Sequence, residues 1–292
     1  MDSAAMDQAA GGVVCPLCGE GEAEPLGLSA NGALVGCPGC TLTYCRALPA
    51  APEGTAVAPY YGAAPDYEDY RRRKEAEWRE LFGRLRRYVP GGRLLDVGCA
   101  RGYSTAVARE LGFAAYGVEP SAADAAYARE QLGLPVQACA VAEADFPAGF
   151  FDAVVMWVVL EHLRDPRGAM AAVARMLRPG GVVNICTVNG ASRVAREQGV
   201  SWVEYNRPGH VVFFSPATLR RLLVEQGLRP VEMYTTLWGA AAAGQRRRGW
   251  LMAPTLAPLR RAAKPVIARL LGRAAWEGEY LAGSAVKSLD ER

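Results

Sequence analysis

Short apolar runs alternate with amphipathic segments from residue 93 to about residue 237. Each apolar run has the length of one buried strand, and the segments between the runs repeat their apolar positions at helical spacing. This alternation predicts an α/β fold in which crossover helices join parallel strands. The predicted strands cover 93–97, 114–118, 135–139, 151–157, 182–188 and 230–237, with a last strand at 280–288. The predicted helices cover 104–111, 121–132, 166–177 and 215–227.

A charged helix is predicted ahead of the first of these strands, over residues 66–89. Its apolar residues can be placed on one stripe, which comprises Tyr70, Trp78, Leu81, Leu85 and Tyr88. The basic run 71–74 then lies on a solvated face, and a Pro-Gly-Gly sequence at 90–92 ends the helix. Residues 50–65 are rich in Pro, Ala and Gly and are expected to form a linker.

Four cysteines near the start of the chain fall into two C-x-x-C pairs. Cys15 and Cys18 form the first pair, and Cys37 and Cys40 form the second. Each pair can direct two thiolates at one ion, and four thiolates complete the tetrahedron of a structural zinc site. The spacing predicts a zinc ribbon within residues 1–50, against the alternative of four unconnected buried cysteines. Cys45 stands outside the pattern and is expected to be a small buried residue.

The composition of the chain is that of a globular protein. Of its 292 residues, 51% are hydrophobic and 22% are charged, which excludes the disordered and fibrous classes. No apolar run is long enough to span a membrane, and the first residues carry aspartates in place of a basic stretch. We therefore expect a cytoplasmic protein, in which a reducing environment suits cysteines that bind metal.

A glycine-rich turn follows the first predicted strand and precedes a helix. It reads Asp96-Val-Gly98-Cys99-Ala100-Arg-Gly102, so that the backbone can approach a ligand closely. Glu119 ends the second strand, where a carboxylate can hold both hydroxyls of a ribose. A dinucleotide would require the spacing G-x-G-x-x-G, whereas this turn has G-x-x-x-G. The pattern therefore favours a nucleoside ligand without a pyrophosphate.

The sequence resembles the class I S-adenosylmethionine (SAM)-dependent methyltransferases. The turn is similar to their D-x-G-C-G-x-G signature, with Ala100 in place of the middle glycine. Three further blocks extend the resemblance over about residues 92–227, namely 151–157, 160–166 and 177–181. The resemblance implies a Rossmann-like sheet of seven strands. An alanine at position 100 is tolerable provided that the turn needs no positive φ there.

The resemblance also implies which residues hold the cofactor SAM. Asp96 and Gly98 would lie near its methionyl end, together with the other turn residues Cys99, Ala100 and Gly102. Glu119 and the adjacent Pro120 would lie at the ribose, and Ala140 and Val141 at the adenine edge. Met156 and Trp157 end the fourth strand beside the cofactor. The alternative for these two residues is plain core packing.

The only two histidines of the chain are candidates for the chemistry of the methyl acceptor. His162 follows Glu161 after the fourth strand, and His210 lies in a polar loop after the fifth, both at carboxyl ends of predicted parallel strands. We expect His210 to act as the general base and Glu161 and His162 to shape or polarise the pocket. In the alternative, His162 packs against its helix and Glu161 pairs with an arginine.

The chain is similar in particular to zinc-ribbon methyltransferases of sugar, natural-product and cell-envelope pathways. Some relatives hold a divalent metal beside the Leu-Glu-His motif with a further Glu or His, and Val158 stands at that position here. The resemblance also places the last two strands in a hairpin, so residues 238–279 would be an insertion beside the acceptor. Between Met233 and Trp276 the chain has eight Lys and Arg residues and no acidic residue. Such a segment could contact an anionic membrane surface, a phosphate-linked acceptor or RNA, or could be a helical lid with a solvated basic face.

These features predict an enzyme of five segments that methylates a hydroxyl of a small-molecule, sugar or lipid-linked acceptor. The segments are a zinc ribbon (1–50), a linker and helix (51–92), a SAM-binding core (93–237), a basic insertion (238–279) and a last strand with its tail (280–292). Carbon methylation is an alternative reaction. An RNA base methyltransferase is a less favoured alternative, because the ribbon has few cations. A SAM-binding scaffold protein without catalytic activity is the third.

Overall fold

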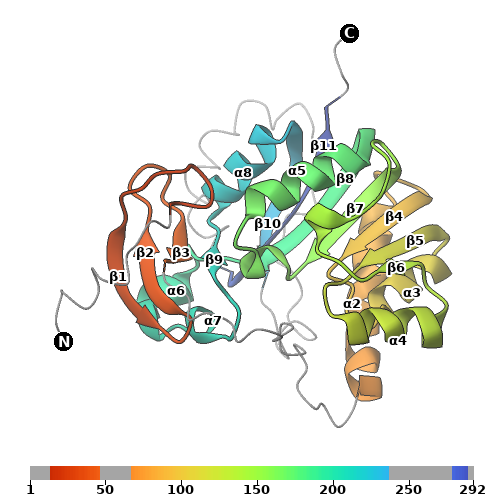
Figure 1. Cartoon of the computed structure of the whole chain (residues 1–292), viewed down its shortest axis with the longest axis horizontal. Helices are drawn as coiled ribbons and strands as arrows, with labels where there is room; N and C mark the ends of the chain where they lie inside the picture. The colour runs from red at the N-terminus through yellow and green to blue at the C-terminus, as the bar shows by residue number, and fades with distance from the viewer. Residues whose placement is uncertain (1–13, 47–66, 237–277, 289–292) are drawn as a thin grey trace, which may run out of the picture.

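The computed structural model describes residues 14–46, 67–236 and 278–288, which form two sheets and their helices (Figure 1). The whole of the predicted linker (50–65) and nearly all of the basic insertion (238–279), with the contacts considered for it, lie outside the described residues. None of the described helices has the length and apolar character that a membrane span requires.

The larger sheet has seven strands in the order β10-β11-β8-β7-β4-β5-β6. The strands are β4 (Gly92–Val97), β5 (Phe113–Val118), β6 (Val136–Gln137), β7 (Phe151–Trp157), β8 (Leu177–Val188), β10 (Leu228–Thr236) and β11 (Tyr280–Lys287). Neighbouring strands from β8 to β6 are parallel, while β11 is antiparallel to both β8 and β10. The parallel strands therefore end at one edge, which is where open α/β sheets bind their ligands.

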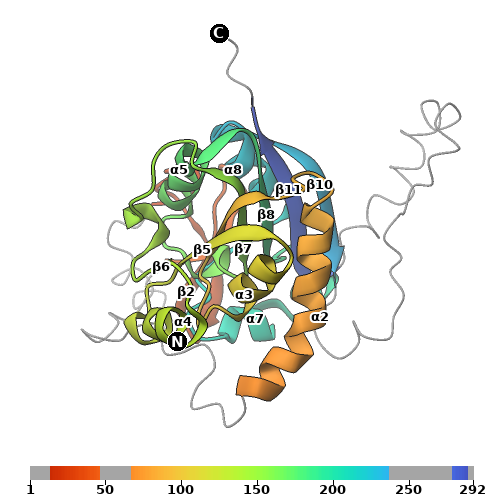
Figure 2. The same cartoon turned by 90° about the vertical axis from the view of Figure 1, so that its right-hand side faces the viewer.

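Helices cover both faces of this sheet (Figure 2). They are α2 (Tyr67–Leu85), α3 (Tyr103–Glu110), α4 (Ala122–Leu132), α5 (Pro166–Met176) and α8 (Pro216–Glu225). Leu94 of β4 packs in one core cluster with α2 and α3, and its neighbour Leu95 packs in another with α5 and α8. This alternation follows from the two-residue period of a strand. Side chains of Ser121, Asp165 and Ser215 cap the N-termini of α4, α5 and α8.

Three details of the sequence prediction were wrong. The third strand covers only Val136–Gln137 instead of 135–139, so Cys139 lies outside the strand, half-buried against the core. Tyr88 is 39% exposed although it was placed on the buried stripe. Helix α2 ends at Leu85, and in the turn that follows it Val89 takes the buried position while Tyr88 is exposed; the N–H of Val89 donates to the carbonyl of Leu85 at 3.0 Å.

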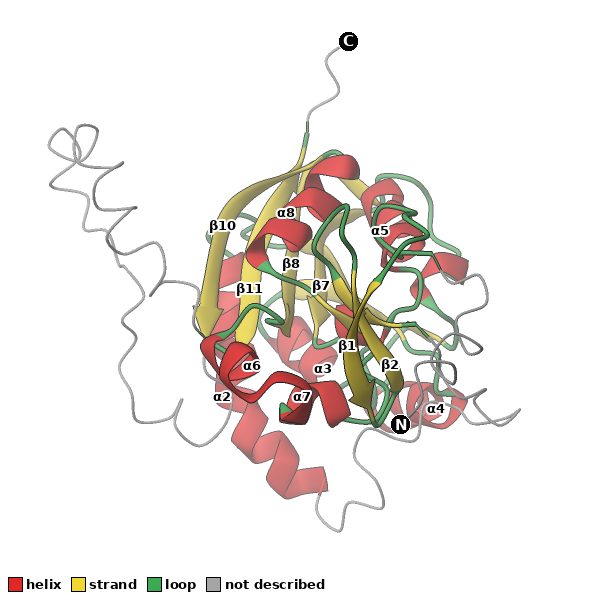
Figure 3. Cartoon of the chain, turned by 90° about the vertical axis from the view of Figure 1, so that its left-hand side faces the viewer, coloured by secondary structure: helices red, strands yellow, loops and turns green. Residues whose placement is uncertain are grey.

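The smaller sheet joins the cysteine-rich segment to the core. Its order is β1-β2-β3-β9, with β1 (Glu24–Ser29), β2 (Gly32–Gly36), β3 (Thr43–Cys45) and β9 (Val212–Phe213). The short elements α6 (Arg193–Gln198), η3 (Gly199–Ser201) and α7 (Val203–Asn206) lie next to it (Figure 3). The ribbon strands thus continue into β9, which begins two residues after His210.

Candidate active site

The glycine-rich turn after β4 has the backbone of a ligand-binding turn. Gly98 has a φ of 69°, and a Cβ atom there would lie 2.8 Å from Cγ2 of Val159. Only glycine therefore permits the close approach of the loop after β7. Ala100 also has a positive φ, 47°, so the condition under which alanine is tolerable at this position is not met. The left-handed conformation costs an alanine about 1–2 kcal/mol.

The carboxylate of Asp96, at the end of β4, holds this turn against the start of α3. It is 4% exposed, and its Oδ2 accepts hydrogen bonds from Ser104 Oγ at 2.6 Å and Thr105 Oγ1 at 2.8 Å. Burial raises the pKa of Asp96 to about 6, and the two hydroxyl donors oppose that shift. Asp96 therefore ties the end of β4 to the first turn of α3.

Glu119 closes the turn from the neighbouring strand. Its Oε2 accepts from the N–H of Ala100 at 2.9 Å, and its Oε1 accepts from the N–H of Ser121 at 2.8 Å. A carboxylate has about four lone-pair sites, so these two bonds leave acceptor capacity for the hydroxyls of a ribose. Burial raises the pKa of Glu119, and the two backbone donors oppose this.

The other predicted cofactor residues lie at or near the same edge of the sheet. Pro120 follows Glu119 and is exposed, and Ala140 is exposed beside the buried Val141. Cys99 is buried. The N–H of Glu119 donates to the carbonyl of Gln137 at 3.0 Å, which brings the ends of β5 and β6 together. Met156 is fully buried in the core cluster and Trp157 is half-buried, so core packing accounts for the position of Met156.

The loop after β7 brings Glu161 to this edge in a buried position. Val158 has a φ of 60°, which is rare for a β-branched residue, and the 3-10 helix η2 (Leu160–His162) follows it. The side chain of Glu161 is 0% exposed, and its Oε2 accepts from Thr187 Oγ1 at 2.8 Å. Its Oε1 has no hydrogen-bond partner among the described residues. Burial raises the pKa of Glu161 to about 8.

His162 and His210 lie against each other beside Glu161. Their ring centroids are 4.7 Å apart, and the rings meet at 80°. Nδ1 of His162 lies 3.0 Å from the carbonyl of Gly209, whose positive φ of 82° brings the loop close. His210 is 0% exposed, and its Nε2 has no hydrogen-bond partner within the described part of the chain. Burial lowers the pKa of His210 to about 3, so its imidazole is neutral.

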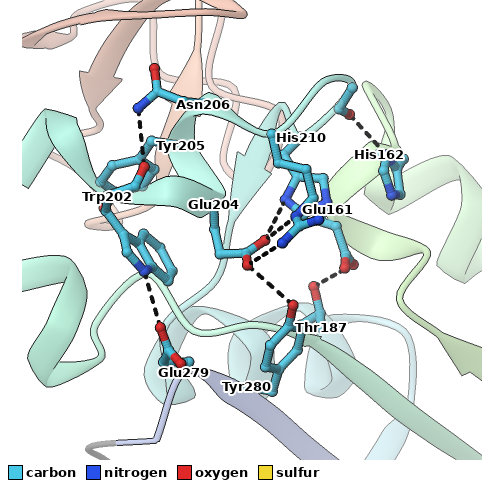
Figure 4. Close-up of polar contacts among 12 residues, drawn as sticks. Glu161, His162, Thr187, Trp202, Glu204, Tyr205, Asn206, His210, Glu279 and Tyr280 are labelled. Carbon is cyan, nitrogen blue, oxygen red and sulfur yellow. Dashed lines mark hydrogen bonds and ion pairs between the residues drawn. The ribbon is translucent and has the colours of Figure 1, made fainter. Parts of the chain in front are cut away.

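Glu204 is a site residue that the sequence analysis missed (Figure 4). It is 4% exposed, and its Oε2 lies 3.3 Å from Nδ1 of His210. The same carboxylate accepts from Nε and Nη2 of Arg207 at 2.8 and 3.0 Å and from the hydroxyl of Tyr280 at 3.3 Å. The Glu-x-x-Arg spacing was a signal for the ion pair. Tyr280 comes from β11 and gave no local signal.

The donor set of Glu161, His162 and His210 fits a divalent metal ion. One ligand atom from each residue lies within 4.8 Å of the others. Two imidazoles and one carboxylate are a common ligand set for divalent transition metals. Leaving a buried polar atom without a partner costs about 1–3 kcal/mol, so the unpartnered Glu161 Oε1 and His210 Nε2 favour a ligand at this point. His210 supplies a third donor although Val158 cannot.

The four ribbon cysteines converge as a zinc site requires. Their Sγ atoms all lie within 4.8 Å of one another. Cys15 and Cys40 are 3.5 Å apart at Sγ, and Cys18 and Cys37 are 3.4 Å apart. Tetrahedral zinc with Zn–S bonds of about 2.3 Å sets its sulfurs ~3.8 Å apart, close to these values. The cluster therefore supports the predicted structural zinc, and Cys45, 6% exposed, is the separate buried cysteine that we expected.

Fold and turn together define the class of the protein. The seven-stranded Rossmann-like sheet, with its antiparallel last strand and the acid-closed turn after β4, is that of class I SAM-dependent methyltransferases. Residues 68–233 match the methyltransferase domain family, and the chain belongs to this family.

Similar proteins agree with this assignment. Over 153 residues the chain is 31% identical to the ubiquinone biosynthesis O-methyltransferase of Dinoroseobacter shibae, an alignment that covers 49% of this chain and 62% of that protein. The enzyme of the same name from Thiobacillus denitrificans is 31% identical over 157 residues, with 50% and 68% covered. A crystal structure of a SAM-dependent methyltransferase from Thermotoga maritima superposes with a TM-score of 0.52 at 19% identity, covering 76% of this chain and 96% of that one. At that identity the superposition demonstrates the fold alone.

Proposed function

We propose that this protein transfers the methyl group of SAM to a hydroxyl oxygen of a small-molecule acceptor. The observation that carries the proposal is the buried cluster of Glu161, His162 and His210. Among the described residues, Glu161 Oε1 and His210 Nε2 have no hydrogen-bond partner, and the cluster lies next to the glycine-rich turn, because Val159 contacts Gly98. The O-methyltransferase relatives support oxygen as the acceptor atom. Sugar and lipid-linked acceptors remain within the proposed class.

In this proposal the chain holds the two reactants in line. Asp96 and the turn residues support the methionyl end of the cofactor, and Glu119 accepts from its ribose hydroxyls. The acceptor oxygen forms the new O–CH3 bond while the S–CH3 bond breaks. The electron pair of the broken S–CH3 bond stays on the sulfur of S-adenosylhomocysteine. Alignment of the two reactants and exclusion of water supply most of the rate enhancement. The hydroxyl proton passes to Nε2 of His210.

Glu204 supports His210 in this role. Its carboxylate, 3.3 Å from Nδ1, would stabilise the imidazolium that forms when Nε2 takes a proton. This support is needed because a base with a pKa of about 3 is weak. Taking a proton from a hydroxyl with a pKa near 10 would cost about 10 kcal/mol without further help.

A divalent cation is a second way to activate the hydroxyl, and the low pKa of His210 favours it. Glu161, His162 and His210 would hold the cation, which lowers the pKa of an oxygen bound to it. In that arrangement Glu204 orients His210 as a ligand. Activation by His210 alone and activation by a bound cation differ in whether the reaction depends on added metal.

The test uses purified protein, SAM with a labelled methyl group and a panel of hydroxylated aromatics, sugars and isoprenoid alcohols. We expect label in a product whose methyl group is on oxygen, as identified by mass spectrometry and NMR. Dialysis against EDTA and readdition of Mg²⁺ or Mn²⁺ separates the metal-dependent variant from the metal-independent one. Label on carbon, label in RNA from a cell extract, or cofactor binding without transfer to any acceptor would contradict the proposal.

A further inference from the structure

The loop that carries His210 is attached to the zinc ribbon just before that residue. Asn31 lies at the tip of the β1–β2 hairpin and is 8% exposed. Its Nδ2 donates to the carbonyls of Tyr205 and Arg207 at 3.3 and 2.8 Å, and its Oδ1 accepts from the N–H of Gly209 at 3.1 Å. One carboxamide therefore fixes three backbone groups of the five residues that precede His210.

The ribbon holds the same loop just after His210. The N–H of Cys45 donates to the carbonyl of Val211 at 2.8 Å, and β3 pairs with β9 through Tyr44 and Val212. The N–H of Val211 in turn donates to the carbonyl of Glu161 at 2.7 Å. His210 is thus held between two ribbon contacts, and the second of these is linked to the backbone of the Glu161 cluster.

Neither the loop that carries His210 nor the zinc ribbon has much stability of its own. The helix α7 of the loop has only four residues, and such short helices are marginal in water. The ribbon strands have three to six residues, and a sheet this small depends on its metal for stability. The position of His210 therefore depends on a folded ribbon.

We propose that the zinc ribbon is a positioning module for the catalytic loop, and that Asn31 is its principal positioning residue. The inference rests on the proposed function for its catalytic consequence, since His210 must meet Glu161 and His162 for the cluster to act. Its structural part does not depend on catalysis. Loss of Asn31 or of zinc frees the segment 204–212 and leaves the SAM-binding turn in place.

The test compares Asn31→Ala and Asn31→Asp with the full-length wild type by hydrogen–deuterium exchange and by kinetics. Asn31→Asp has the same shape, but its carboxylate faces the carbonyls of Tyr205 and Arg207. We expect amide exchange in 204–212 to rise at least tenfold in both variants. We expect kcat to fall at least tenfold, and the Kd for SAM to stay within twofold.

Asn184→Ala is the matched control. Asn184 is also a buried asparagine, 5% exposed, but its Nδ2 donates to Ser284 Oγ at 3.0 Å within the central sheet. This variant is expected to lose stability without faster exchange in 204–212. Equal exchange of that segment in wild type and in both Asn31 variants would overturn the inference, as would an equal increase in Asn184→Ala.

A zinc-free ribbon provides a second, independent test. Cys40→Ser removes one ligand, and it should increase exchange in 204–212 while residues 92–119 keep their protection. Unchanged exchange in 204–212 after measured loss of zinc would overturn the inference. If the wild type methylates no acceptor, the exchange experiment still decides the positioning role, so failure of the proposed function can be told apart from failure of this inference.

Discussion

The ring edge of one histidine meets the face of the other in the pair His162 and His210, whose centroids are 4.7 Å apart. The two residues come from loops that follow β7 and β8, which are neighbours in the sheet. Parallel neighbours end at the same edge, so a polar residue after each strand is brought into one cluster. Glu161 adds a buried carboxylate to the pair.

Replacement of His210 by glutamine should affect turnover far more than cofactor binding. Within the described part of the chain, neither the hydrogen bonds of Asp96 nor those of Glu119 involve His210, so SAM should bind within twofold of wild type. Loss of a general base or of a metal ligand should lower kcat by about 10²–10⁴-fold. Steady-state kinetics and calorimetric titration with SAM measure the two effects. Losses of similar size in both would mean that His210 has a structural role.

Gly98 and Ala100 form a matched pair of residues with positive φ in one turn. Gly98→Ala should destabilise the protein and weaken SAM binding, because its Cβ would lie 2.8 Å from Cγ2 of Val159. Ala100→Gly relieves the left-handed alanine but adds entropy to the unfolded chain, so stability should change by less than about 1 kcal/mol. Urea unfolding and SAM titration check both variants. The same loss in both would refute the role of the Gly98–Val159 contact.

Asp96 should make the protein less stable as the pH rises through its titration range. The pKa of Asp96 is about 6 in the folded protein, against an ordinary aspartate value of 3.8 that applies to the unfolded chain. The folded state therefore binds the proton more tightly. Folding is therefore favoured below pH 3.8, and this contribution is lost by about pH 6. A pKa that rises from 3.8 to about 6 on folding corresponds to about 3 kcal/mol.

The variant Asp96→Asn isolates this effect. Its amide does not titrate, so its stability relative to wild type should increase by about 2–3 kcal/mol between pH 4 and pH 7. Urea unfolding at both pH values gives the difference, and other titrating groups cancel in the comparison. A difference that is constant with pH, or that decreases, would show that Asp96 has no raised pKa.

Cys37→Ser should release zinc and destabilise the ribbon. Wild-type protein is expected to contain one zinc per chain, and the variant less than a tenth of that, because a serine hydroxyl is a poor replacement for a thiolate. Elemental analysis measures the metal, and thermal unfolding measures the stability. Ala substitution of the half-buried Cys139 is a suitable control that should keep its zinc. Wild-type protein without stoichiometric zinc would contradict the ribbon.

Local sequence patterns were sufficient to predict most of the fold. The alternation around Leu94 and Leu95, the serine caps and the paired cysteines each encode their structure within a few residues. The same holds for the two histidines, because topology places the ends of neighbouring parallel strands together. The predictions that were wrong concern boundaries: Tyr88 follows the last turn of α2, and Cys139 follows a strand of two residues.

The parts of the site that were missed depend on tertiary contacts. Asn31 and Glu204 are separated by more than half of the chain, yet both contact the segment around Arg207. Tyr280 reaches Glu204 only because β11 enters the sheet beside β8. Pairings of this kind leave no periodicity in the sequence. The positive φ of Ala100 was also beyond reach, since alanine gives no signal for a left-handed residue.

A crystal structure with S-adenosylhomocysteine tests the central claim most directly. We expect the ribose hydroxyls to donate to the Glu119 carboxylate and the sulfur to face the cluster of Glu161, His162 and His210, with the segment 204–212 in place beside it. A sulfur that points to another edge of the sheet, or a product cofactor bound away from Glu119, would contradict methyl transfer at this cluster.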